Sequence, residues 1–86
     1  MNRRKLLAKA LNGSKNFRFG EATALAKAFG FQLSRTRGSH HIFAHPNVRE
    51  LVNLQEVDGK AKPYQVRQLL EIVERYDLKL QAGEEL

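Results

Sequence analysis

The chain has 86 residues, 42% of them hydrophobic, and a formal net charge of +6. At this length folding buries only about 60–65% of the unfolded surface, so we expect one domain with a thin core. The absence of cysteine excludes disulfides, thiolate nucleophiles and zinc–thiolate sites. No apolar run approaches the ~20 residues of a membrane-spanning helix, and Lys9 interrupts the apolar start too early for a signal peptide. We therefore expect a cytoplasmic protein with no membrane association.

The charge is unevenly placed along the chain. Residues 1–20 carry six basic side chains and no acidic one, whereas residues 63–86 carry three basic and five acidic side chains. The N-terminal and central parts of the chain are cationic. This pattern favours a polyanionic partner, in particular nucleic acid.

Two helices are predicted in the first third of the chain. Residues 3–11 form a short one that stops at Asn12-Gly13. A polar connector follows, and the apolar positions of residues 21–29 recur at helical spacing. Gly30 is placed to end this second helix in the left-handed conformation.

Three strands and a last helix are predicted next. Residues 31–35 alternate apolar and polar side chains, as a half-buried strand does, and residues 39–44 and 51–57 form the other two strands. The turns between them fall at Arg37-Gly38 and Pro46-Asn47, and Asp58-Gly59 closes the third strand. Pro63 opens the last helix, which we expect to end near Leu78 and to leave residues 81–86 frayed.

This order predicts an α+β fold in which helices cover one face of a three-stranded antiparallel sheet. The central α-β-β-β-α order is that of a double-stranded-RNA-binding-like fold. We expect a single domain over residues 1–86, with its core at about 18–78 and residues 1–17 as a helical extension.

The run Gly38-Ser39-His40-His41 contains the candidate residues for proton transfer. An imidazole transfers protons near neutral pH, and Arg35 and Arg37 precede it in the chain. His40 is thus either a general acid or base or an ordinary strand histidine. His41 points to the opposite face, and it reads as structural or as an RNA contact. His45 is interpreted as a loop-end histidine, and the histidine spacing does not favour a metal site.

Cationic side chains at two places are candidate phosphate contacts. Arg35 and Arg37 either bind phosphate or keep an exposed strand edge from pairing with other sheets. Lys60 and Lys62 lie just before the last helix, where its N-terminus favours an anion. Gly38 and Ser39 complete the candidate RNA-binding set, although the turn alone explains Ser39.

The run from Gly38 to Phe43, continued by Ala44-His45-Pro46, resembles the signature of HicA (YcfA-like) mRNA interferase toxins. The resemblance implies the toxin of a type II toxin–antitoxin system, an endoribonuclease that cuts mRNA without a metal or other cofactor. It implies that His40 is catalytic, that the substrate is single-stranded mRNA and that a HicB-type antitoxin neutralises the protein. Two alternatives stay open: a non-catalytic RNA- or DNA-binding module, and a decayed toxin that retains only antitoxin binding.

Overall fold

The computed structural model describes residues 2–13 and 15–81. Within these ranges, seven elements follow one another: α1 (Arg3–Leu11), α2 (Phe19–Ala28), β1 (Gln32–Arg37), β2 (His40–His45), β3 (Val48–Val57), β4 (Lys60–Ala61) and α3 (Pro63–Arg75). The strands form one antiparallel sheet in the order β1-β2-β3-β4. None of the helices in the described ranges is long and apolar enough to cross a membrane.

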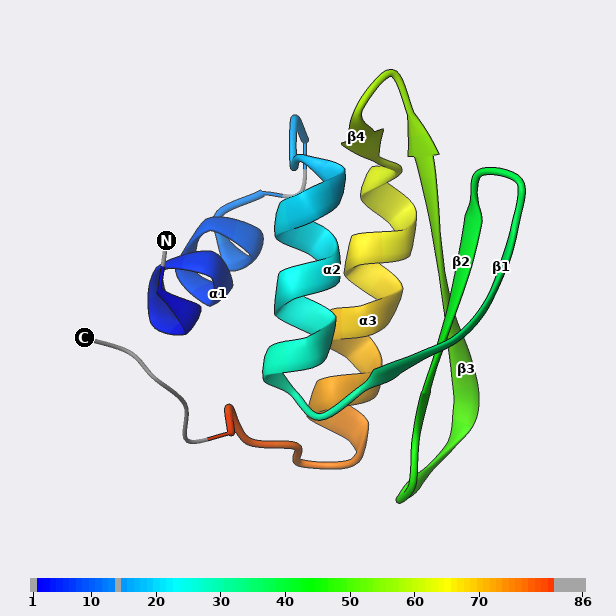
Figure 1. Ribbon diagram of the computed structural model, residues 1–86. Helices are drawn as coiled ribbons and strands as arrows, with labels where there is room; N and C mark the ends of the chain where they lie inside the picture. Colours follow the sequence, from blue (N-terminus) through cyan, green and yellow to red (C-terminus); the bar gives the residue numbers. More distant parts are fainter. Residues whose placement is uncertain (1, 14, 82–86) are drawn as a thin grey trace.

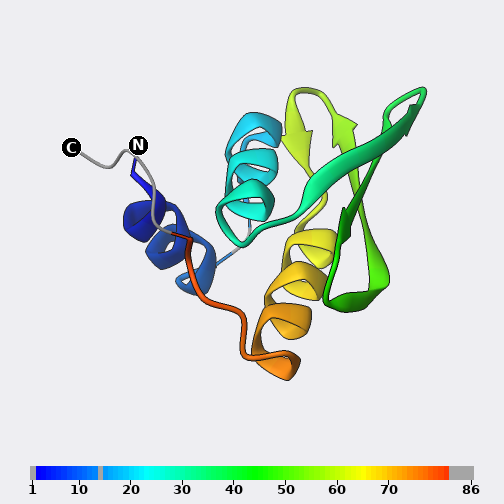
Figure 2. The same cartoon turned by 60° about the horizontal axis from the view of Figure 1, so that its bottom comes forward.

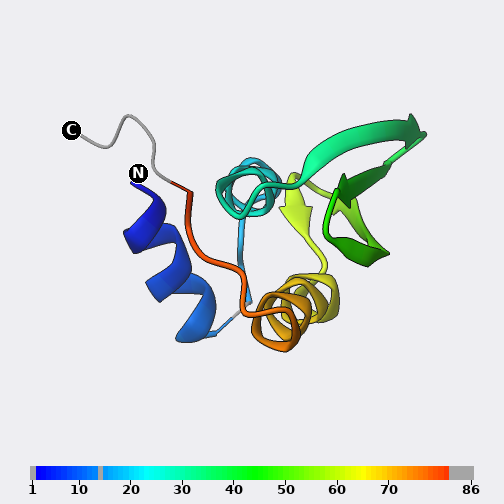
Figure 3. The same ribbon diagram turned by 90° about the horizontal axis from the view of Figure 1, so that it is seen from below.

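The elements stack in layers. Figure 1 and Figure 3 show α2 and α3 side by side on one face of the sheet, with α1 on the far side of this helix pair. The core between the layers holds four fully or almost fully buried aromatic rings: Phe17, Phe29, Phe31 and Phe43. Among the described residues no helix covers the opposite face of the sheet, as Figure 2 also shows. The predicted α+β arrangement, with helices on one face of an antiparallel sheet, is therefore confirmed.

The sheet has four strands, so the prediction of three was one too few. Asp58 and Gly59 both have positive φ values, 53° and 77°, as a two-residue hairpin turn requires. The chain turns back at once and pairs Lys60 with Val57. The N–H of Ala61 also donates to the carbonyl of Phe17 at 2.9 Å, which ties this short strand to the segment before α2.

Several predicted boundaries shift for local reasons. The helix α2 begins at Phe19 instead of Glu21, because the Glu21 carboxylate accepts the backbone N–H of Arg18 and caps the helix. The strand β3 begins at Val48, directly opposite His45, because the Pro46-Asn47 turn is tight. The strand β1 is exposed along its whole length, so its prediction as half-buried was wrong.

Both of the long helices end in the same hydrogen-bonded motif. At the end of α2, Gly30 has a φ of 95°, and the N–H groups of Gly30 and Phe31 donate back to the last turn, as predicted for Gly30. At the end of α3, Asp77 takes the left-handed position with a φ of 52°. The helix therefore stops at Arg75, three residues before the predicted end.

The segment after α3 returns to the α1 side of the molecule. The N–H of Gln81 donates to the carbonyl of Ala28 at 2.8 Å. Gln81 was predicted to be frayed, and for this residue the prediction was wrong. The rest of that prediction, residues 82–86, lies outside the described residues. On α1 itself, Leu6 and Ala10 are buried, so the N-terminal helix is packed into the core.

Polar side-chain contacts join β3 to the end of α3. The Glu50 carboxylate accepts hydrogen bonds from the Tyr76 hydroxyl, at 2.6 Å, and from Arg75. The Tyr76 hydrogen bond is the main cause that lowers the pKa of Glu50, and the same bond raises the pKa of Tyr76. This contact closes the end of the sheet that lies away from Gly38.

Candidate active site

The hairpin between β1 and β2 sets the place of His40. Gly38 has a φ of 56°, and a glycine with positive φ at the first turn position suits a two-residue hairpin. The turn pairs Arg37 with His40, so His40 is the first residue of β2. The position expected at the strand entrance is the one observed.

His40 lies on the open face of the sheet. Its neighbour in sequence, His41, is opposite the fully buried Leu54, and successive side chains of a strand point to opposite faces. On the open face, the Nδ1 atom of His40 lies 3.1 Å from Nδ2 and 3.2 Å from Oδ1 of Asn53. Among the described residues none bonds to Nε2 of His40, so this nitrogen is available to a ligand.

His41 occupies a different environment on the helix-covered face. Its ring centroid lies 4.6 Å from that of Phe19, at the start of α2. Its Nδ1–H donates to the carbonyl of Ser39 at 3.2 Å, because a carbonyl oxygen can only accept. The two adjacent histidines are thus separated by the sheet, as predicted, and cannot act on one reacting group.

His45, at the end of β2, has a packing role. Its ring meets the buried Phe31 ring edge-on at 5.1 Å between centroids. Its Nδ1 atom accepts the N–H of Asn47 at 3.0 Å. The described residues contain no group of three or more side chains of the kinds that ligate metals.

Arg35 and Arg37 are brought to the face that carries His40. Arg37 is opposite His40, and Arg35 is opposite Ile42, two residues further along β2. Directly opposite residues of an antiparallel pair share a face. Both side chains are exposed, and within the described ranges neither guanidinium has a protein partner. This face therefore presents an imidazole and two cations to solvent.

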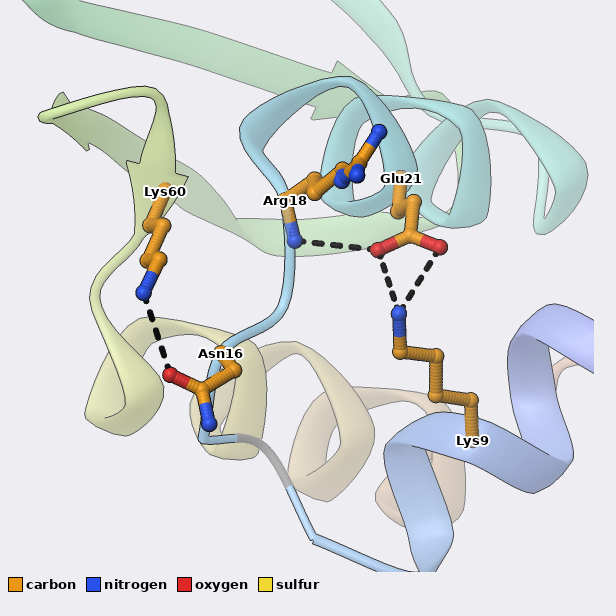
Figure 4. A network of polar contacts seen from close by, with 5 residues as sticks. All are labelled: Lys9, Asn16, Arg18, Glu21 and Lys60. Carbon is orange, nitrogen blue, oxygen red and sulfur yellow. Dashed lines mark hydrogen bonds and ion pairs between the residues drawn. The ribbon is translucent and has the colours of Figure 1, made fainter.

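Lys60 and Lys62 lie at the same end of the sheet, toward the α3 side. Lys60 is on β4, two strands away from β2, and Lys62 is the N-cap residue of α3. The ammonium group of Lys60 donates to Oδ1 of Asn16 at 3.1 Å, as Figure 4 shows. These lysines and the hairpin cations are separate groups around one end of the molecule.

Sequence reasoning missed Arg18 as a member of this cationic end. A bridge pairs Arg18 with Lys60, although 41 residues separate them in the chain. Arg18 is also the N-cap residue of α2, and its side chain is exposed. Its position in a polar connector gave no periodic signal, so only the tertiary pairing reveals it.

The start of α2 is fixed by an ion pair with α1. The Lys9 ammonium lies 2.7 and 2.9 Å from the two carboxylate oxygens of Glu21 (Figure 4). The hydrogen bond from Lys9, followed by that from the Arg18 backbone, holds the pKa of Glu21 below its usual value. Lys9 therefore stabilises the fold, whereas the side chain of Arg18 is exposed to solvent.

Comparison with known families gives one match. Residues 20–74 match the family described as the HicA toxin of bacterial toxin-antitoxin. No match to the chain was found among curated proteins or among solved structures. The matched span runs from the first turn of α2 almost to the end of α3 and covers well over half of the chain. The chain therefore belongs to the HicA toxin family.

Proposed function

We propose that this toxin is an endoribonuclease that cleaves single-stranded mRNA through His40 and needs no metal or other cofactor. The observation that carries the proposal is the open sheet face, where Nε2 of His40 is available beside the exposed Arg35 and Arg37. An imidazole supplies proton transfer, and guanidinium groups bind phosphate oxygens with directed hydrogen bonds.

The proposed reaction is an internal transfer within the RNA. Nε2 of His40 takes the proton from a ribose 2′-hydroxyl, and that oxygen attacks the adjacent phosphorus. The bond from phosphorus to the 5′-oxygen of the next nucleotide breaks, and this oxygen takes a proton from water. The hydroxide that remains takes the proton from Nε2 of His40, which restores the neutral ring. The products are a 2′,3′-cyclic phosphate end and a 5′-hydroxyl end. Arg35 and Arg37 stabilise the charge that develops on the phosphoryl oxygens.

The remaining predicted contacts extend the RNA path over the same end of the molecule. Lys60 and Lys62 bind phosphates near the start of α3, and His41 borders the path beside Phe19. The turn residues Gly38 and Ser39 join the strand that carries Arg35 and Arg37 to the strand that begins at His40. We further propose that a HicB-type antitoxin covers this end, and that the protein works in the bacterial cytoplasm, where mRNA is translated.

Cleavage assays in EDTA test the mechanism. We expect wild-type protein to cut single-stranded RNA with cyclic phosphate ends, and His40→Ala to lower the rate by about 10²–10⁴-fold, the usual effect of losing proton transfer. His41→Ala is the matched control, an adjacent imidazole on the other face, and should lose at most about tenfold. Loss of activity in EDTA that a divalent ion restores would refute the metal-independent mechanism.

A binding assay with the same variants separates an enzyme from a binding module. We expect His40→Ala to bind RNA within about twofold of wild type, since the phosphate contacts supply most of the affinity. Wild-type protein that binds RNA tightly but leaves it intact would instead support the non-catalytic alternative.

A further inference from the structure

Asn53 is the one side chain that the described structure places in hydrogen-bonding contact with His40. It projects from β3 opposite Ile42, while His40 is opposite Gln55, so the two are diagonal neighbours on the open face. Both side chains are half-buried. The amide atoms of Asn53 lie at 3.1 and 3.2 Å from Nδ1 of His40.

The amide can meet Nδ1 in two orientations with opposite consequences. If Nδ2 donates to Nδ1, the proton of a neutral ring lies on Nε2, and this contact turns repulsive once Nδ1 is protonated. If Oδ1 accepts from Nδ1–H, the lone pair of Nε2 faces the ligand. This second contact persists when Nε2 has taken a proton. Only this orientation serves His40 as a base both before and after proton transfer.

We propose that Asn53 is a positioning residue, whose Oδ1 atom accepts from Nδ1–H and directs the basic Nε2 of His40 at the RNA. This inference rests on the proposed function of His40. The neighbouring His41 shows the same principle with a different partner, because its Nδ1–H is held by the Ser39 carbonyl. A neutral amide fixes the tautomer of His40 without adding a negative charge to a face that receives phosphate.

The first test is a kinetic cycle with a matched control. We expect Asn53→Ala to lower the single-turnover rate of RNA cleavage ten- to hundredfold, the effect of a hydrogen bond to a charged group, with RNA affinity unchanged within twofold. Gln55→Ala removes an amide from the same strand and face, directly opposite His40, and should leave the rate within twofold. In a His40→Ala background, Asn53→Ala should have no further effect, because the two residues act as a unit.

The conservative variant Asn53→Asp distinguishes a positioning role from a merely structural one, because only a positioning residue should change the pH–rate profile. Asn53→Asp keeps an oxygen acceptor, so it should recover most of the rate lost in Asn53→Ala. The added carboxylate favours the charged ring, so the acid side of its pH–rate profile should shift to higher pH. The charged groups on the neighbouring strand of this face, Arg35 and Arg37, are the same in every variant.

The second test does not depend on RNA cleavage. Imidazole ¹⁵N chemical shifts should show the Nδ1–H tautomer of His40 in wild-type protein and a mixture of tautomers in Asn53→Ala. A wild-type ring protonated on Nε2, or tautomers that do not change in the variant, would overturn the inference even if RNA is cleaved. A wild-type protein with the expected tautomer but no RNase activity would refute the proposed function, and with it the positioning role.

Discussion

Replacing Gly30 by alanine tests the packing between the end of α2 and His45. Gly30 has a φ of 95°, and a Cβ atom there would lie 2.9 Å from Nε2 of His45 and 2.7 Å from Nε2 of Gln81. Gly59 is the matched control. Its φ is 77°, and a Cβ atom there would meet nothing within 4 Å. Comparison of the two alanine variants therefore separates backbone strain from the clash.

The two variants should differ by the free energy needed to move the His45 ring. A left-handed conformation costs an alanine about 1–2 kcal/mol at either position. At position 30 the end of the Gln81 side chain can swing away, but the His45 ring packs on Phe31 and accepts the Asn47 N–H. Giving up that hydrogen bond adds about 1 kcal/mol. We expect a total loss of about 2–3 kcal/mol for Gly30→Ala and about 1–2 kcal/mol for Gly59→Ala.

Urea unfolding measured by circular dichroism gives the two free energies, and thermal melts should show a further drop of about 4–8 °C for Gly30→Ala relative to Gly59→Ala. In a His45→Ala background, Gly30→Ala should cost no more than Gly59→Ala does in the wild type, since neighbouring residues couple. Equal losses for Gly30→Ala and Gly59→Ala in the wild-type background would show that the His45 ring yields freely and would refute the reasoning.

Two further predictions concern charge, and a third concerns backbone strain. Replacing Arg35 and Arg37 together by alanine should reduce the slope of log RNA affinity against log salt by about 1.4, at about 0.7 for each lost phosphate contact with a single strand; an unchanged slope would place the RNA elsewhere. Glu21→Gln should lower the free energy of unfolding at pH 7 by about 0.5–1 kcal/mol through loss of the Lys9 ion pair. Because the folded pKa of Glu21 lies below 4.5, the wild-type advantage is complete above that pH and should vanish in urea melts as the pH falls through the folded pKa. Asp77→Gly should raise the free energy of unfolding by about 0.5–1 kcal/mol, because it relieves about 1–2 kcal/mol of left-handed strain and the backbone entropy of glycine offsets about half of that gain; an unchanged melting temperature in a thermal melt would contradict this.

Helix positions were the most predictable part of the fold. The apolar spacing located all three helices, and Gly30 marked the end of α2 because glycine is the usual residue at a left-handed helix end. The end of α3 was missed because Asp77 adopts the same conformation without being a glycine. The strand β4 was missed because two residues are too few to show any periodicity.

The face on which Arg35 and Arg37 lie depends on a register shift between β1 and β2 that could not be predicted from the sequence. In an unbroken strand, Leu33 would share a face with both arginines. The register shifts by one residue between Leu33 and Arg35, so Leu33 is opposite the buried Phe43 and both arginines stay beside His40. The alternation predicted for residues 31–35 is therefore broken at Ser34, where β1 has one residue more than its partner strand.

The partner of His40 depends on a second irregularity, in β3. The turn pairs His45 with Val48, and a regular ladder from that pair would put His40 directly opposite Asn53. The register instead shifts between Phe43 and His45 by two residues, which places Gln55 opposite His40 and moves Asn53 to the diagonal position. A shift of two keeps each side chain of β3 on its original face, so Asn53 still reaches the imidazole. The motif around Gly38 and its resemblance to the HicA family thus suggest a catalytic histidine, whereas the residue proposed to orient it is visible only once the register of the sheet is known.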